Sequence, residues 1–251
     1  MAHALEPARA AFAAPGPIGR WGLGYAQSGE ILLSRNPRLH PDGVDLYGVI
    51  EDLRSDCLIA HAAAPDGLVG NANTQPFRYR QWMFAQDGEI DDPDPLCAQL
   101  DAHIPDFLRR HVKGRTVAEH AFHVFLAQLH QAGSVDAPNL APLEARRLLA
   151  QAVALIRAAV ARADAATRLG NLIVSNGRLL VAAHLDQALY MRRLTVADPR
   201  GSRDESFRGV LVVSAATVPG AGFEEIPAGA VLLVNRTIDT EIVPLDEHDP
   251  A

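Results

Sequence analysis

The sequence contains few cysteines, since Cys57 and Cys97 are the only two among its 251 residues. Two cysteines this far apart cannot form a disulfide framework or a cysteine-based zinc site. A reducing compartment suits such a chain best, and we therefore expect a cytoplasmic protein.

Long apolar runs are also missing. The alanine-rich N-terminal segment is interrupted by Glu6, Pro7 and Arg9, so it lacks the continuous apolar core of a secretion signal. No later segment approaches the roughly 18 uninterrupted apolar residues that a membrane-spanning helix needs. The sequence therefore predicts a soluble protein with no membrane partner.

Clustered positive charge is the third absence. The 23 Lys and Arg residues are outnumbered by 30 Asp and Glu residues, which gives a formal net charge of -7 and a sequence pI of about 5.8. A surface that binds nucleic-acid phosphates needs grouped Lys and Arg side chains to displace counterions. We therefore expect no nucleic-acid partner.

Apolar residues make up 48% of the chain, enough to bury a substantial core in a single domain covering residues 1–251. Short apolar stretches between turn residues predict strands in the first half and again after Gly170. The predicted strands cover residues 21–25, 31–33, 57–60, 82–85, 171–174, 179–184, 188–193, 210–213 and 230–234. Strands, then helices, then strands favour two sheets covered by helices over alternating βαβ units.

Two helices are predicted between these groups of strands. Apolar residues recur on one helical face between residues 116 and 131, and Thr116 with Glu119 has the spacing of a capping box. A longer helix should run from residue 142 to about residue 166. The turn Ser175-Asn176-Gly177 predicts a tight hairpin, because an Asn-Gly pair accepts positive φ angles. Residues 198–206 form a polar, charged connection.

Five short sequence motifs occur in a particular order along the chain. They are Arg20-Trp21-Gly22-Leu23-Gly24-Tyr25, Ile59-Ala60-His61, Asn73-Thr74-Gln75-Pro76-Phe77, Gln86-Asp87-Gly88-Glu89-Ile90 and Gly114-Arg115-Thr116-Val117-Ala118-Glu119. Their order and spacing resemble the small stand-alone class II glutamine amidotransferases over nearly the whole chain. The resemblance implies an N-terminal-nucleophile fold, an αββα sandwich of two mainly antiparallel sheets flanked by helices.

The resemblance also implies where an active site would lie and what is altered there. The family's nucleophile is a cysteine that follows the initiator Met, and the matching residue here is Ala2, which has no nucleophilic atom. The family's oxyanion-stabilising Asn corresponds to Asp87, so a carboxylate replaces a hydrogen-bond donor; losing one such donor costs about 10²–10³ in rate. The family's carboxylate-binding Arg corresponds to Ala63, and its ammonium-binding Asp to Val117.

These substitutions define a relic pocket, which we expect to hold no catalytic residue and no cofactor. Its expected members are Ala2, His61, Ala63, Asn73, Thr74, Gln75, Asp87, Gly88 and Val117. Neither Cys57 nor Cys97 can become the N-terminal residue without a cleavage deep inside the domain. The family residues that this sequence retains are mostly those that form turns or pack in the core.

Histidines offer an alternative, a metal site. His120 and His123 are three residues apart, which places both on one helical face. No Asp or Glu completes a metal-binding motif with them or with His61, His130 and His184, so we expect no metal.

The sequence thus predicts a catalytically inactive amidotransferase-like protein that acts as a binding, structural or regulatory subunit. A protein partner, such as an enzyme encoded nearby, and a small-molecule ligand in the relic pocket are both compatible with this reading. An amidotransferase or amidohydrolase of the same fold that uses non-standard residues stays open as the alternative.

Overall fold

A computed structural model describes residues 9, 13–14, 17–50, 53–90, 93–163, 167–196, 207–216 and 218–246. Ala2 and the predicted connection 198–206 lie outside the described residues. All strand pairs in the described part are antiparallel. None of the described helices is long and apolar enough to cross a membrane.

The strands within the described residues form four sheets. The largest has the order β14 (Thr240–Pro244), β13 (Ala230–Val234), β9 (Leu180–Ala183), β8 (Thr167–Ser175), β7 (Trp82–Ile90) and β6 (Phe77–Tyr79). Two smaller sheets have the orders β3 (Glu30–Asn36), β2 (Arg20–Gln27), β5 (Leu58–Ala63) and β11 (Phe207–Ser214), β10 (Leu189–Val196), β12 (Glu224–Glu225). The fourth pairs β1 (Ala13–Ala14) with β4 (Val44–Asp45).

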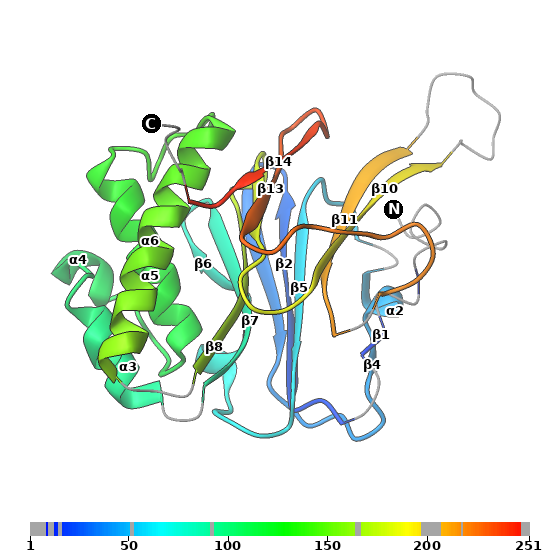
Figure 1. The fold of residues 1–251 in the computed structure, drawn as a ribbon. Coiled ribbons are helices and arrows are strands. Elements are labelled where there is room, and N and C mark those ends of the chain that lie inside the picture. The colour runs from blue at the N-terminus through cyan, green and yellow to red at the C-terminus, as the bar shows by residue number, and fades with distance from the viewer. Residues whose placement is uncertain are drawn as a thin grey trace.

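The helices are α2 (Leu46–Ile50), α3 (Pro93–Asp101), α4 (Asp106–Arg109), α5 (Val117–Gln131) and α6 (Pro142–Ala163), with a 3-10 turn at Asn71–Asn73. Figure 1 shows α3 to α6 together on one side of the six-stranded sheet, while β2, β5, β10 and β11 lie on its other side. The helix α2 lies beyond them, on the outer side of that second layer. The order of layers is therefore helix, sheet, sheet, helix, and the predicted fold class is confirmed.

The main core lies between the six-stranded sheet and the helices. The helix α5 is buried along almost its whole length. Its Phe122 ring stacks on Phe84 of β7 with ring centroids 5.3 Å apart, and its Phe125 ring meets Trp82 edge to face at 5.5 Å. Aromatic pairs of this kind stabilise a core beyond the area they bury. They fix α5 against β7, and so help position the strand that carries Asp87.

Several sequence expectations need correction in detail. Both predicted long helices lie on the same side of the six-stranded sheet, and the five-residue α2 forms the outer helical layer. The hairpin after β8 forms, but Ser175 pairs with Leu180, which leaves four connecting residues. Only Gly177 has a positive φ there, because Asn176 uses its side chain to accept hydrogen bonds from two backbone N–H groups.

The capping box forms only in part. Thr116 caps α5, since its hydroxyl accepts a hydrogen bond from the Glu119 N–H at 3.3 Å. The Glu119 carboxylate does not return to the N-cap and instead accepts hydrogen bonds from the backbone N–H groups of Lys113 and Gly114. This carboxylate therefore orders the loop that precedes the helix.

Candidate functional site

The strands β5 and β7, which carry His61, Ala63 and Asp87, both end at the bottom of Figure 1. The β7–β8 register shifts between Asp87 and Glu89, which marks a bulge. Gly170 of β8 faces this bulge with a φ of 63°, and a Cβ there would lie 1.0 Å from the Asp87 carbonyl oxygen. Only glycine fits such a position, so Gly170 permits the bulge that presents Asp87.

Gln75 joins β5 to β7. Its side-chain oxygen accepts a hydrogen bond from the Gln86 N–H at 2.7 Å, and its side-chain nitrogen donates to the Gln86 carbonyl at 2.9 Å. The same nitrogen lies 3.3 Å from Nε2 of His61. The carboxamide thus pairs with the β7 backbone as another strand would, and it holds His61 next to the bulge.

Asp87 belongs to a chain of polar contacts that sequence reasoning missed. The Ser214 hydroxyl of β11 donates to the Asp87 carboxylate at 2.7 Å, and the Asn171 amide donates to the Ser214 oxygen at 2.8 Å. Asn171 also donates to the Gln187 carbonyl at 2.7 Å. Strands from both sheet layers therefore fix the carboxylate in place.

His61 is held in its neutral form at neutral pH. Its pKa is lowered to about 4, mainly by burial; the charge of Asp87 opposes the shift, and the charge of Arg20 adds to it. The imidazole is therefore a neutral base beside a carboxylate, in a position where both a cation and an anion act on it.

Arg20 lies directly opposite Ala63 in the β2–β5 pairing. Its neighbour Trp21 packs against α2 on the outer face, so Arg20 points to the other face, toward the six-stranded sheet. Burial lowers its pKa, and Asp66 opposes that shift. Arg20 thus brings positive charge to the strand position next to Ala63. The alternation of Arg20 with Trp21 was the signal in the sequence that could have identified it.

The other predicted site residues have structural roles or stand apart. Asn73 accepts from the Arg115 N–H at 2.9 Å and donates to the Val69 carbonyl at 2.8 Å, and the buried Thr74 donates to the Gly70 carbonyl at 2.9 Å. Val117 is 2% exposed and belongs to the core between the helices and the six-stranded sheet. Gly88 is exposed in the bulge.

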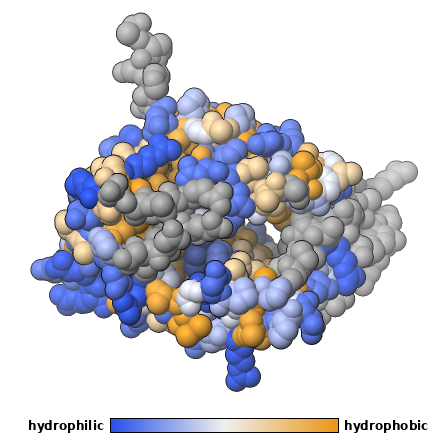
Figure 2. All heavy atoms as spheres, turned by 60° about the horizontal axis from the view of Figure 1, so that its bottom comes forward, coloured by the Kyte–Doolittle hydropathy of each residue, from blue (hydrophilic) through white to orange (hydrophobic). Residues whose placement is uncertain are grey.

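Figure 2 brings the bottom of Figure 1 forward and shows a hollow near the centre of this face. The structure thus brings together His61, Gln75 and Asp87, with Ala63 on the same strand as His61. Val117 does not join them, since its side chain packs in the core.

Neither cysteine is poised for nucleophilic chemistry. Burial raises the pKa of Cys57 to about 11, and its Sγ lies 3.1 Å from the Ser175 hydroxyl oxygen. Burial raises the pKa of Cys97 to about 12. A thiol attacks as its thiolate, so both groups are inert near neutral pH.

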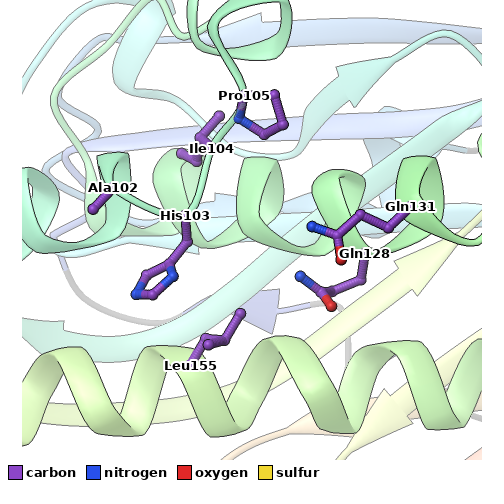
Figure 3. Close-up of a pocket in the computed structure, with 7 residues that line it drawn as sticks. All are labelled: Ala102, His103, Ile104, Pro105, Gln128, Gln131 and Leu155. Atoms are coloured by element: carbon purple, nitrogen blue, oxygen red, sulfur yellow. The ribbon is translucent and has the colours of Figure 1, made fainter.

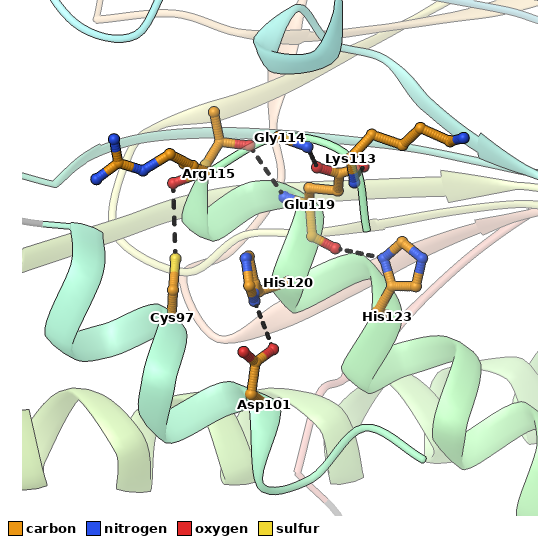
Figure 4. Close-up of polar contacts among 9 residues, drawn as sticks. Cys97, Asp101, Lys113, Gly114, Arg115, Glu119, His120 and His123 are labelled. Carbon is orange, nitrogen blue, oxygen red and sulfur yellow. Dashed lines mark hydrogen bonds and ion pairs between the residues drawn. The ribbon is translucent and has the colours of Figure 1, made fainter. Parts of the chain in front are cut away.

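The histidines considered as metal ligands make other contacts. In α5, Nδ1 of His120 lies 2.9 Å from a carboxylate oxygen of Asp101, and Nδ1 of His123 donates to the Glu119 carbonyl at 2.8 Å (Figure 4). Nδ1 of His184 lies 2.6 Å from the Ile226 carbonyl oxygen. Within the described part of the chain, no three His, Cys, Asp or Glu residues are grouped to hold a metal ion.

Comparison with known families identifies relatives of this chain. Residues 8–199 match the family model of class II glutamine amidotransferases. The chain belongs to the class II glutamine amidotransferase family. No curated protein matches the chain.

Two solved structures share the fold. A glutamine aminotransferase class-II domain protein from Silicibacter pomeroyi is 21% identical with a TM-score of 0.63, and the match covers 94% of this chain and 98% of that chain. A protein from Pseudomonas aeruginosa described as a predicted glutamine amidotransferase is 19% identical with a TM-score of 0.52, covering 90% and 87%. At such low identity the likeness shows the fold alone.

Proposed function

We propose that this class II glutamine amidotransferase-like protein does not hydrolyse glutamine and acts as a binding or regulatory subunit of a protein complex. The observation that carries the proposal is the state of the two cysteines. Burial raises the pKa of both thiols far above 7, and Asp87 is not among the charges that act on either of them. The chain therefore lacks a described thiolate that could attack an amide.

The surroundings of Asp87 support the same conclusion. An oxyanion forming next to this carboxylate would meet negative charge where the reaction needs donors. Ser214 donates its hydroxyl to the carboxylate, so that donor is already in use. The low pKa of His61 keeps the nearby imidazole neutral, and it supplies no compensating positive charge at neutral pH.

A direct assay tests the loss of catalysis. Purified protein incubated with L-glutamine should release no ammonia above a buffer blank, while a known glutaminase in the same assay calibrates detection. Ammonia release that disappears in both His61→Ala and Asp87→Ala would show that the site works with non-standard residues, and the proposal would be wrong.

The binding role has a separate test. Tagged protein should co-purify with an enzyme encoded near it, in a fixed stoichiometry by size-exclusion chromatography. Arg20→Glu and Arg38→Glu form a matched pair, because Arg38 is exposed and Arg20 lies opposite Ala63 in the β2–β5 pairing. Equal recovery of the enzyme with both variants places the partner away from the site, and recovery of no enzyme argues against a subunit role.

A further inference from the structure

A cavity of about 540 Å³ lies on the helical side of the molecule, away from His61 and Asp87. Its walls come from the turn at residues 102–105 between α3 and α4, from the C-terminal half of α5, and from the middle of α6 (Figure 3). A cavity of this size accommodates a small organic molecule. Neither the family site nor the proposed function uses it.

Gln128 of α5 is the unexplained group in this cavity. It is only 8% exposed, yet its carboxamide makes no hydrogen bond to any of the residues that the structure describes. Its side-chain oxygen and nitrogen are not among the fully buried unpaired atoms of the described residues, so the carboxamide opens onto the cavity. Figure 3 shows the Gln128 carboxamide pointing into the space between α5 and α6.

Gln128 lies on a face of α5 that otherwise carries buried apolar residues. Ala121, Val124 and Gln128 follow one another at helical spacing, and the first two are fully buried apolar residues. Packing alone would continue this stripe with another apolar side chain. Gln131, three residues further on, adds a second carboxamide at the mouth of the cavity.

The remaining walls define the ligand chemistry. Ile104 and Leu155 supply apolar surface, and no Asp, Glu, Lys or Arg lines the cavity. The His103 imidazole also lines the cavity, and its Nε2 lies 3.4 Å from the guanidinium of Arg162, which is not one of the lining residues. Each carboxamide offers a donor and an acceptor side by side. Such a lining matches a neutral planar group that carries an adjacent acceptor and donor of its own.

We propose that this cavity binds a small neutral ligand through a carboxamide, a lactam or a nucleobase edge, paired with the Gln128 carboxamide. Apolar parts of the ligand lie against Ile104 and Leu155. In the free protein, water occupies the polar end of the cavity, and a ligand that reproduces its hydrogen bonds displaces it.

The test uses full-length 15N-labelled protein and three probes of similar size. Benzamide carries the adjacent donor and acceptor, acetophenone carries the acceptor alone, and benzoate is an anion. Benzamide should bind saturably, shift the side-chain amide signals of Gln128, and bind about tenfold more tightly than acetophenone. The Gln128→Leu variant should lose that difference. Gln151→Leu, an exposed glutamine of α6, is the matched control and should keep it.

Stability provides an independent readout. Because the carboxamide is unpaired, Gln128→Leu should leave the urea midpoint of the free protein unchanged or raise it. A lowered midpoint would show that Gln128 has a structural partner and would overturn the proposal. Benzoate binding as tightly as benzamide, benzamide binding that survives Gln128→Leu, or no saturable benzamide binding would each overturn it as well.

Discussion

Acidification should destabilise the protein partly through His123, a histidine of α5 that is only 3% exposed. Its Nδ1–H donates to the Glu119 carbonyl, and its Nε2 is buried with no hydrogen-bond partner among the described groups. The pKa of His123 is lowered from 6.5 to about 4, mainly by burial; the Glu119 hydrogen bond opposes the shift, and the neighbouring His120 and His111 add to it. Protonation would place a charge on Nε2 where no acceptor receives it.

The sign follows from the lower pKa of the folded state. Below pH 6.5 the unfolded chain binds a proton at His123 more readily than the folded protein does, so stability is complete above that value and is lost as the pH falls toward 4. A pKa difference of this size is worth about 3 kcal/mol when fully developed. Between about pH 7.5 and about pH 5 the loss from this one residue amounts to roughly 2 kcal/mol.

Urea unfolding followed by circular dichroism at these two pH values measures the loss. His123→Gln removes the titrating group, so its free energy of unfolding should depend less on pH by roughly 2 kcal/mol. His61 has a similarly low pKa and leaves a residual slope in this variant. His130→Gln, at the exposed end of the same helix, should keep the wild-type slope. A His123→Gln variant with an unchanged slope would refute the reasoning.

Three further predictions follow from burial and backbone geometry. Cys57 and Cys97 should resist a thiol reagent at neutral pH and react fully in urea, because burial suppresses both thiolates; rapid labelling of the native protein would contradict this. Gly170→Ala should destabilise the fold by about 3 kcal/mol or more, because its Cβ would collide with the β7 backbone; Gly133→Ala, at a similar positive φ but with open space around it, should cost only about 1 kcal/mol in the same urea titration. Val117→Asp should lower stability by about 3 kcal/mol or more, since it buries a carboxylate in the helical core, and a wild-type melting temperature would show that the side chain reaches solvent.

Periodicity predicted the elements with strong apolar patterns and missed those without them. The helix α5 and the strand β13 are buried almost throughout, and their residues gave clear signals. The strand β14 is an edge strand with mostly exposed side chains, so it shows no apolar alternation. The helix α3 spans nine residues and starts in an acidic segment, which left too few turns for its pattern to be recognised.

The polar contacts of the candidate site were harder to predict than the strands that carry them. Gln75 and Asp87 belong to two of the short motifs that carry the family resemblance. Ser214 follows Asp87 by more than a hundred residues, and only the packing of β11 against the six-stranded sheet brings the two together. Such contacts depend on how the two layers are stacked, which local sequence patterns do not determine.

The β2–β5 register changes how the substitution at Ala63 should be judged. The family resemblance implies that a positive charge is missing at Ala63, yet Arg20 stands on the neighbouring strand directly opposite it. Paired residues in an antiparallel sheet have Cβ atoms about 5 Å apart, so a long side chain at one position can occupy the space above the other. Arg20 therefore brings positive charge near His61 from another strand; burial is the main cause of the low pKa of His61, Asp87 opposes the shift, and Arg20 adds a smaller lowering. Asp87 carries the opposite charge on the other sheet, so the two walls of the site remain polar although no described thiolate is present. This pair of opposite charges supports the proposed binding role, in which the site holds a molecule rather than cleaving it.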